Sequence, residues 1–332
     1  MNRALLFSKF VKYNSIDQFI INTPSANVLF NTPVDIYIDI QSIYKHILSE
    51  TLLSTDVKVL SINILNLAAH YRHYFYKHGV NTRIYIVNGT NNNNTIVSKI
   101  NSQNQNLFTI VQKIVPYFPL VYYIEKPYNG SAIILSLLQS ETSPLNHSSL
   151  IISNDIYSYQ IPALVPLSFL LRPSTNTKFI SYNNVINSMY PRNKSVSVSD
   201  LSPALLPVIM TYHKCPELGM EMLNNFKSAI GIIRNKIAQN QILNNYNSPI
   251  VFKNEPDAIF KRIYMSDLLS AARTYSNSYD NLINNWKIYK PYDINVLANI
   301  LDSKFNIDGE NLFNYLFLMD VGETFVKNMI SL

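Results

Sequence analysis

Two aspartates each follow an apolar run and precede a helical pattern, a placement that could gather acid for catalysis. Asp39 ends the run that begins at Val34, and Asp155 follows Leu150-Ile-Ile152 after two small polar residues. The carboxyl ends of parallel strands share one edge, where open α/β sheets bind ligands, so we expect the two carboxylates to lie close together. Hard dications prefer such oxygen ligands. The alternative is that each aspartate caps the helix that follows it.

The segments that would position these aspartates alternate between strand and helix patterns. Strand patterns cover residues 34–40, 83–87, 121–124, 150–152 and 177–180, and helical patterns cover 42–50, 56–78, 107–117 and 131–139. This alternation predicts an α/β fold with a mostly parallel central sheet flanked by helices. From residue 183 onward only helical patterns occur. We therefore expect an N-terminal lead-in at 1–33, an α/β domain at 34–182 and a helical domain at 183–332.

Four stretches carry a resemblance to a known family: Ile36-Tyr-Ile-Asp39, Ile84-Tyr-Ile-Val-Asn-Gly89, the segment 125–133, and Ile151-Ile-Ser-Asn-Asp-Ile-Tyr157. Together with the element order, they resemble the flap endonuclease or 5′-nuclease (PIN-like) superfamily, with the T-even phage RNase H type as the nearest comparison. The resemblance implies a parallel sheet followed by a helical half. It also implies phosphodiester hydrolysis by two divalent metals held among clustered carboxylates.

Most of the acids that this resemblance implies are replaced in this chain. Asn88 stands where the family's second strand ends in an acid, and the three acids of the third stretch fall on Asn129, Ser131 and Ala132. In the fourth stretch one acid is kept, and the other is Tyr157. Asp39 and Asp155 are therefore the remaining candidates for catalytic or metal-ligating residues, with Mg²⁺ or Mn²⁺ as the cofactor of an active protein. Two carboxylates are too few for a two-metal centre.

The charge balance is compatible with a nucleic-acid partner. The chain has 27 Lys and Arg against 21 Asp and Glu, a formal net charge of +6. Aromatic residues such as Trp286 beside basic ones fit base stacking combined with phosphate neutralisation, and a solvated helix face is the alternative. Where the resemblance implies a basic arch, the polar loop at 88–106 has Lys99 as its only basic residue. The candidate contacts to DNA or RNA are Lys253, Lys261, Arg262, Arg273 and Lys287.

Other ionisable residues offer weaker sites. His70, His73 and His78 lie on one predicted helix. His70 and His73, three residues apart, could share a face and bind a metal ion, and the alternative is an ordinary basic face. Asp35 and Glu125 could add acid to the aspartate pair or point elsewhere.

The cysteine count and the hydropathy of the chain indicate which cellular compartment to expect. Cys215 is the single cysteine, which excludes an intrachain disulfide and a cysteine-built metal site and favours a reducing, intracellular compartment. Neither a signal peptide nor an apolar run long enough to span a bilayer is recognised, so no membrane partner is expected. The abundance of Asn, Ile, Lys and Tyr, with only 7 Gly, is typical of an AT-rich genome such as that of a phage or large virus.

Three hypotheses of function remain open. The first is a catalytically inactive 5′-nuclease-like protein that serves as a structural or nucleic-acid-associated component, for example in a virion or another assembly of viral proteins. The second is an active Mg²⁺- or Mn²⁺-dependent 5′-3′ exonuclease or flap endonuclease with a reduced metal site. The third is a protein-interaction scaffold without nucleic-acid binding.

Overall fold

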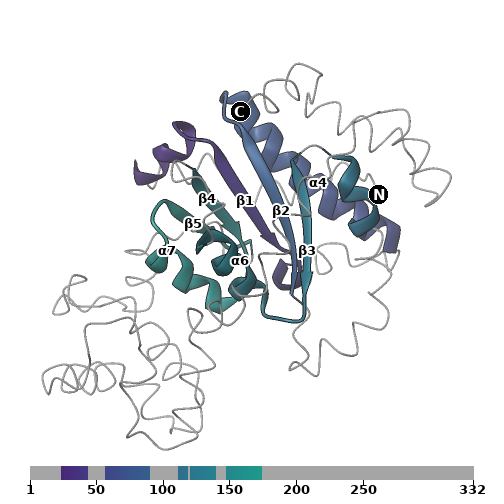
Figure 1. Cartoon of the computed structure of the whole chain (residues 1–332). Helices are drawn as coiled ribbons and strands as arrows, with labels where there is room; N and C mark the ends of the chain where they lie inside the picture. Colours follow the sequence, from purple (N-terminus) through teal and green to yellow (C-terminus); the bar gives the residue numbers. More distant parts are fainter. Residues whose placement is uncertain (1–23, 44–56, 90–110, 119, 140–146, 174–332) are drawn as a thin grey trace, which may run out of the picture.

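Five parallel strands form the centre of the part that the computed structural model describes, which comprises residues 24–43, 57–89, 111–118, 120–139 and 147–173 (Figure 1). The strand order is β3-β2-β1-β4-β5, and every neighbouring pair is parallel. This sheet confirms the predicted fold class. The strands are β1 (Val34–Asp39), β2 (Thr82–Gly89), β3 (Val121–Lys126), β4 (Ser148–Ile152) and β5 (Ser168–Leu171).

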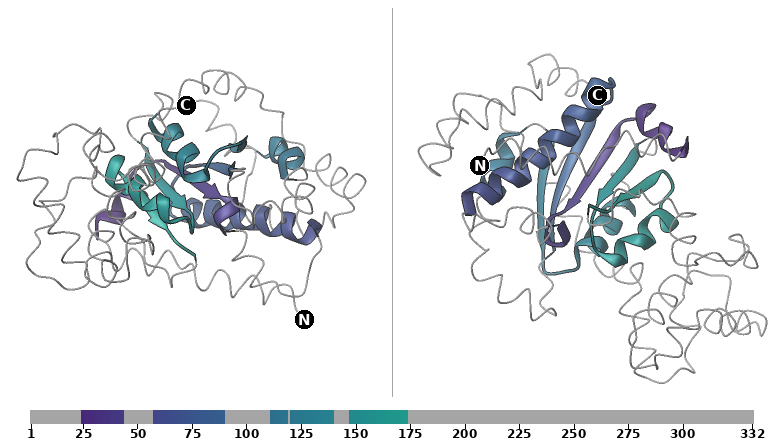
Figure 2. Two further views of the ribbon diagram at one scale, coloured as in Figure 1. Left: turned by 90° about the horizontal axis from the view of Figure 1, so that it is seen from below. Right: turned by 180° about the vertical axis from the view of Figure 1, so that it is seen from behind.

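Helices cover both faces of the sheet, which explains why its strands are apolar runs and do not alternate with polar residues. On one face Ile36 and Ile38 pack with α4 (Val57–Lys77), which lies in front of the strands in the right-hand view of Figure 2. On the other face Tyr37 packs with α6 (Gly130–Gln139), and Ile161 of the short α7 (Ile161–Leu164) joins the same core. Successive residues of β1 therefore serve opposite cores, and Asp39 faces the α6 side with Tyr37.

The ends of α4 and α6 follow from their sequences. Gly79, just beyond α4, has a φ of +74°, the left-handed conformation that a glycine adopts at a helix C-terminus without strain. The helix therefore ends one residue before the end of the helical pattern predicted at 56–78. α6 carries no charged side chain, and all its residues from Gly130 to Leu138 are buried. Apolar packing on all sides therefore stabilises this helix. Its first turn lies against the end of β1.

The structure differs from the sequence prediction at several segments. β5 was not predicted, because its four residues follow α7 without a polar break and periodicity alone cannot divide such an apolar stretch. Asn88 and Gly89, predicted as the start of the polar loop, belong to β2. The helix predicted at 107–117 ends in the 3₁₀ turn η2 (Val115–Tyr117), and the lead-in holds the 3₁₀ helix η1 (Pro24–Phe30).

Other predictions lie outside the described residues. These are the strand at 177–180, the domain boundary at 182 and the helical half from 183 onward. Among the helices of the described ranges, none combines the length and the apolar character needed to cross a membrane.

Candidate functional site at the carboxyl edge of the sheet

Asp39 is the last residue of β1 and is buried, with 2% of its surface exposed. Its Oδ1 accepts a hydrogen bond from the backbone N–H of Ser42 at 3.3 Å, so the carboxylate caps the helical turn that starts at residue 40. Its Oδ2 accepts from the hydroxyl of Ser153 at 2.9 Å. The second bond joins the end of β1 to the turn that follows β4.

Asp155 lies at the same edge of the sheet, after β4, which is a neighbour of β1. It caps the 3₁₀ helix η3 (Ile156–Gln160). Its Oδ1 accepts from the backbone N–H of Tyr157 at 3.2 Å. Its Oδ2 accepts from the Ser131 hydroxyl at 2.7 Å and from Asn129 Nδ2 at 3.1 Å. Both aspartates are thus helix caps, as the second interpretation of the sequence proposed.

A chain of serine hydroxyls connects the two carboxylates. Ser153 Oγ, which donates to Asp39, accepts from the backbone N–H of Asp155 at 3.0 Å and from Ser158 Oγ at 2.9 Å. Ser158 Oγ in turn lies 2.6 Å from Ser131 Oγ, which donates to Asp155. The structure therefore brings Asp39 and Asp155 together through three buried serines.

The start of α6 is pressed against Asp39. A Cβ atom on Gly130 would lie 2.6 Å from Asp39 Oδ1 and 2.8 Å from its Cγ. One on Gly89, at the end of β2, would lie 2.4 Å from the backbone nitrogen of Gly130. Both positions therefore require glycine, because real Cβ atoms do not approach other atoms so closely. The first turn of α6 fills the space directly beside the carboxylate.

Burial changes the electrostatics of this edge. Burial, and then the charge of Asp155, raise the pKa of Asp39 to about 7, although the hydrogen bonds from Ser153 and Ser42 act in the opposite direction. Near neutral pH the carboxyl of Asp39 is therefore protonated in about half of the molecules. This partial protonation lowers the negative charge of the Asp39–Asp155 pair. Among the described residues, neither of these two carboxylates forms an ion pair.

The residues at the edge do not fit the two-metal centre that the family resemblance implies. Asn129 and Ser131, which stand in place of acids, direct hydrogens at Asp155, whereas a dication would need oxygen lone pairs there. Ala132 is buried within α6, and Tyr157 donates its backbone N–H to Asp155. In the described ranges no group of three His, Cys, Asp or Glu side chains is placed to hold a metal ion.

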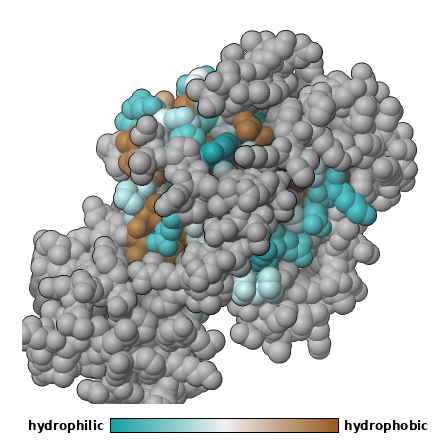
Figure 3. All heavy atoms as spheres, viewed as in Figure 1, coloured by the Kyte–Doolittle hydropathy of each residue, from teal (hydrophilic) through white to brown (hydrophobic). Residues whose placement is uncertain are grey.

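Asn88 is directed away from the aspartate pair. Its Oδ1 accepts from Gln41 Nε2 at 2.8 Å, and its Nδ2 donates to the Tyr123 hydroxyl at 2.9 Å. That hydroxyl donates to the exposed carboxylate of Glu125 at 2.9 Å. In Figure 3 hydrophilic side chains gather on the side of the molecule where β3 lies. Asn88 and Glu125 thus belong to a separate polar chain along β2 and β3.

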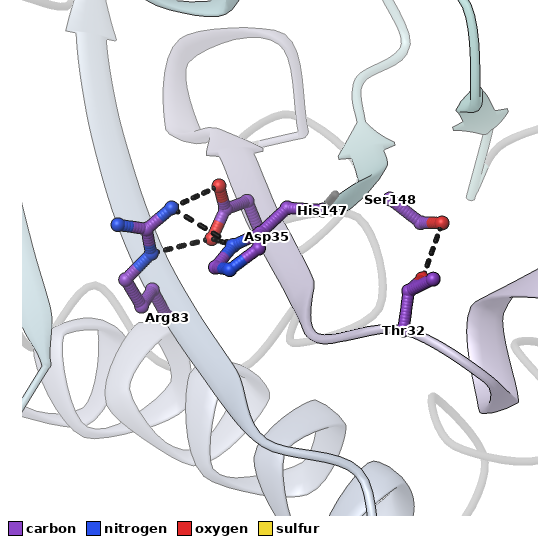
Figure 4. Close-up of polar contacts among 5 residues, drawn as sticks. All are labelled: Thr32, Asp35, Arg83, His147 and Ser148. Atoms are coloured by element: carbon purple, nitrogen blue, oxygen red, sulfur yellow. Dashed lines mark hydrogen bonds and ion pairs between the residues drawn. The ribbon is translucent and has the colours of Figure 1, made fainter. Parts of the chain in front are cut away.

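Asp35 does not add acid to the candidate site. It lies near the start of β1 with 1% of its surface exposed, and Arg83 binds it with two hydrogen bonds, at 2.7 Å from Nε and 2.6 Å from Nη2 (Figure 4). His147 Nδ1 lies 3.0 Å from Arg83 Nη2 and 3.3 Å from Asp35 Oδ1. This ion pair, in which Asp35 is buried and Arg83 is partly exposed, links β1 to β2 across facing register positions, at the opposite end of β1 from Asp39.

The three histidines of α4 and its C-terminal turn have different surroundings. Burial, helped by nearby His73 and Lys77, lowers the pKa of His70 to about 4. His78 is exposed, and its ring packs edge-on against Phe30 with centroids 4.8 Å apart. The described residues around them form no metal-binding group. The nucleic-acid candidates Lys253, Lys261, Arg262, Arg273 and Lys287, together with Cys215, lie outside the described residues.

The sequence prediction missed the residues that complete the site: Ser42, Gly130, Ser153 and Ser158. Their signal was present as small polar residues in the turns between strand and helix patterns, as in Ser153-Asn-Asp155 and Asn129-Gly-Ser131. Serine and asparagine are common in any turn, so the pattern does not single out a site. Only the pairing of β1 with β4 places Ser153 beside Asp39.

Comparison with solved structures returns nucleases. The catalytic core of Rad2 in complex with a DNA substrate is 13% identical, over 88% of this chain and 93% of that chain, with a TM-score of 0.45. The T5 D15 protein co-crystallised with metal ions is 10% identical, over 86% of this chain and 99% of that chain, with a TM-score of 0.41. Comparison with protein-family models and with curated proteins finds no match.

Rad2 is a flap endonuclease and the D15 protein a 5′-exonuclease, the class that the sequence resemblance predicts. The α/β fold class rests on the five-stranded parallel sheet itself, and the T-even phage RNase H type stays a prediction. Because the identities and TM-scores are low, neither likeness carries an argument about activity, substrate or metal.

Proposed function

We propose that this protein is a catalytically inactive 5′-nuclease-like protein that serves as a structural or nucleic-acid-associated component, in a phage or large-virus assembly. One observation carries the proposal: all four carboxylate oxygens of Asp39 and Asp155 accept hydrogen bonds from the protein itself, at 3.3 Å or less. Two-metal hydrolysis needs several carboxylate oxygens open to the cations.

The donors at these oxygens belong to the fold. Two of them are the backbone N–H groups of Ser42 and Tyr157, which the carboxylates cap. A cation at these oxygens would leave the capped turns without their acceptors, at about 1 kcal/mol for each cap. The remaining donors are the side chains of Ser153, Ser131 and Asn129, which lie between β1, α6 and η3. The edge is thus built as a hydrogen-bonded junction between elements.

Association with DNA or RNA rests on the charge of the chain. The net charge of +6 and the basic residues Lys253, Lys261, Arg262, Arg273 and Lys287 would attract a phosphate backbone. A protein without the cleavage step would hold a strand by phosphate neutralisation and stacking alone. Location in a reducing compartment and packaging in a virion stay predictions.

A cleavage assay tests the inactive state. The full chain is incubated with single-stranded and flapped DNA in Mg²⁺ or Mn²⁺ and compared with the Asp39→Asn, Asp155→Asn double variant. We expect the same background for both proteins. Metal-dependent cleavage that is lost in the double variant would contradict the proposal and favour the active, acid-poor nuclease.

The salt dependence of DNA binding tests the partner. We expect affinity for single-stranded DNA to fall steeply between 50 and 200 mM salt, roughly in proportion to the number of phosphates contacted. Replacing the five basic candidates by Gln should flatten that dependence. Binding that is absent, or that does not change with salt, would favour the protein-interaction scaffold.

A further inference from the structure

We propose that Asn129 and Ser131 take the place of a divalent cation beside Asp155, so that these two donors help to keep the edge free of metal. The inference rests on the proposed function and deepens it, because it assigns the absence of metal chemistry to two named side chains. It predicts that replacing one of these donors by a carboxylate opens the edge to a dication.

Both side chains act on the same oxygen of Asp155. The Ser131 hydroxyl lies 2.7 Å and Asn129 Nδ2 3.1 Å from Asp155 Oδ2. A dication bound to that oxygen would sit at about 2.1–2.5 Å, where it would meet the positive ends of the O–H and N–H dipoles. The two donors thus supply partial positive charge and at the same time occupy the space that a cation would need.

The orientation of the Asn129 amide follows from its other bonds. Its Oδ1 accepts from the backbone N–H of Ser131 at 2.8 Å and of Ala132 at 3.4 Å, so it caps the start of α6. A flipped amide would direct its NH₂ group at these two donors and its oxygen at Asp155. The hydrogen-bond network therefore assigns the NH₂ group to the side of Asp155.

This orientation makes Asn129→Asp a change of one atom with a defined effect. The new carboxylate keeps one oxygen on the α6 cap and places the other where Nδ2 faces Asp155 Oδ2. Asp39 lies beside the adjacent residue Gly130. Three carboxylates would then gather at one end of the sheet, an arrangement that a dication stabilises and that repels itself without one.

The test uses the full chain and needs no activity. Wild type, Asn129→Asp and the control Asn81→Asp are unfolded thermally in EDTA, Mg²⁺ and Mn²⁺, and Mn²⁺ binding is followed by electron paramagnetic resonance. Asn81 precedes β2 at the other end of the sheet, where its carbonyl accepts from Val34, so the control adds the same charge away from the edge. We expect Asn129→Asp to unfold several degrees below wild type in EDTA and to recover saturably with Mn²⁺.

Wild type and Asn81→Asp should show neither the loss nor the recovery. Saturable Mn²⁺ binding by wild type, or an Asn129→Asp variant that responds no more than Asn81→Asp, would overturn the inference. If Asn129→Asp does not fold, Ser131→Asp compared with the neutral, equal-sized Ser131→Asn asks the same question. An inactive wild type with an unresponsive Asn129→Asp overturns this inference alone, whereas cleavage by wild type overturns the proposed function.

Discussion

The Ser153 hydroxyl donates to Asp39 Oδ2 at 2.9 Å, and this bond fastens the turn after β4 to the end of β1. Ser153 is fully buried and also accepts the backbone N–H of Asp155. One serine thus orients both aspartates of the edge. A hydrogen bond to a buried carboxylate is stronger than one between neutral groups, so this contact is expected to matter for stability as well as for geometry.

Replacing Ser153 by Ala should lower the free energy of unfolding by roughly 2–3 kcal/mol, because Asp39 loses a donor and the N–H of Asp155 loses its acceptor. Urea unfolding at pH 8, where Asp39 is ionised, measures the loss. The matched control is Ser168→Ala, since the buried Ser168 hydroxyl donates to the neutral carbonyl of Val165 at 2.7 Å and should be worth about 1 kcal/mol. Equal losses would contradict the special role of the carboxylate.

The raised pKa of Asp39 predicts a loss of stability as the pH rises. Its pKa is 3.8 when unperturbed and about 7 in the fold, so the folded state binds more protons than the unfolded state between these values. The free energy of unfolding should therefore fall from pH 4 to pH 7, by at most roughly 1.4 kcal/mol per pH unit, and level off above. Asn at this position does not titrate, so Asp39→Asn should gain stability relative to wild type over the same interval.

His70 has the opposite effect on the pH dependence of stability, so wild type must be compared with Asp39→Asn. Its pKa is lowered from 6.5 to about 4, so the folded state binds fewer protons than the unfolded state in that interval, and stability is lost as the pH falls. The two slopes oppose each other below pH 6.5 in wild type. The difference between wild type and Asp39→Asn in urea unfolding isolates the aspartate. A difference that does not change with pH would show that Asp39 is ionised throughout.

The Asp35–Arg83 pair predicts a large coupling between two residues. Arg83→Met leaves the carboxylate of Asp35 buried without its main partner and should cost about 3–5 kcal/mol, since an unpaired buried charge is strongly destabilising. The double variant Asp35→Asn, Arg83→Met should cost less than Arg83→Met alone. Arg172→Met is a suitable control, because the hydrogen bonds that Arg172 donates to Tyr159 and to the Asn154 carbonyl involve no acid. Additive costs in a double-mutant cycle would exclude the coupling.

The sheet could be predicted from the sequence because its strands are short apolar runs between helical patterns. Val34–Asp39 and Ser148–Ile152 are buried on both faces, and such runs mark strands of a parallel sheet. Ser168–Leu171 could not be separated from the apolar residues before it. The positions of Asp39 and Asp155 at the carboxyl ends followed from the same pattern.

The chemistry of the edge could be predicted only in part. The sequence shows that Asn129 and Ser131 replace acids, but not that both direct hydrogens at one oxygen of Asp155. Asn88 was aligned with a metal-ligand position, yet its side chain contacts Gln41 and Tyr123 on the other side of the sheet. Side-chain direction at the end of a strand depends on pairing and twist, which residue types do not specify.

Gly130 offers a direct test of how tightly α6 is packed against Asp39. Alanine favours a helix over glycine by about 1 kcal/mol, so helix propensity alone predicts that Gly130→Ala stabilises the protein. The added Cβ would lie 2.6 Å from Asp39 Oδ1, however, and the hydrogen bonds from Ser153 and Ser42 hold that carboxylate in place. We therefore expect a net loss of about 1–3 kcal/mol from overpacking, measured by urea unfolding.

The same substitution in the Asp39→Ala background separates the clash with Asp39 from other effects at position 130. Without a carboxylate beside it, the new methyl group should cost much less, so the two changes together should cost less than the sum of the single ones. Ser136→Ala in the same buried helix serves as the control for propensity and should not depend on residue 39. If Gly130→Ala costs the same with and without the carboxylate, the first turn of α6 does not rest on Asp39, and the close approach that leaves no room for a cation on that side is wrong.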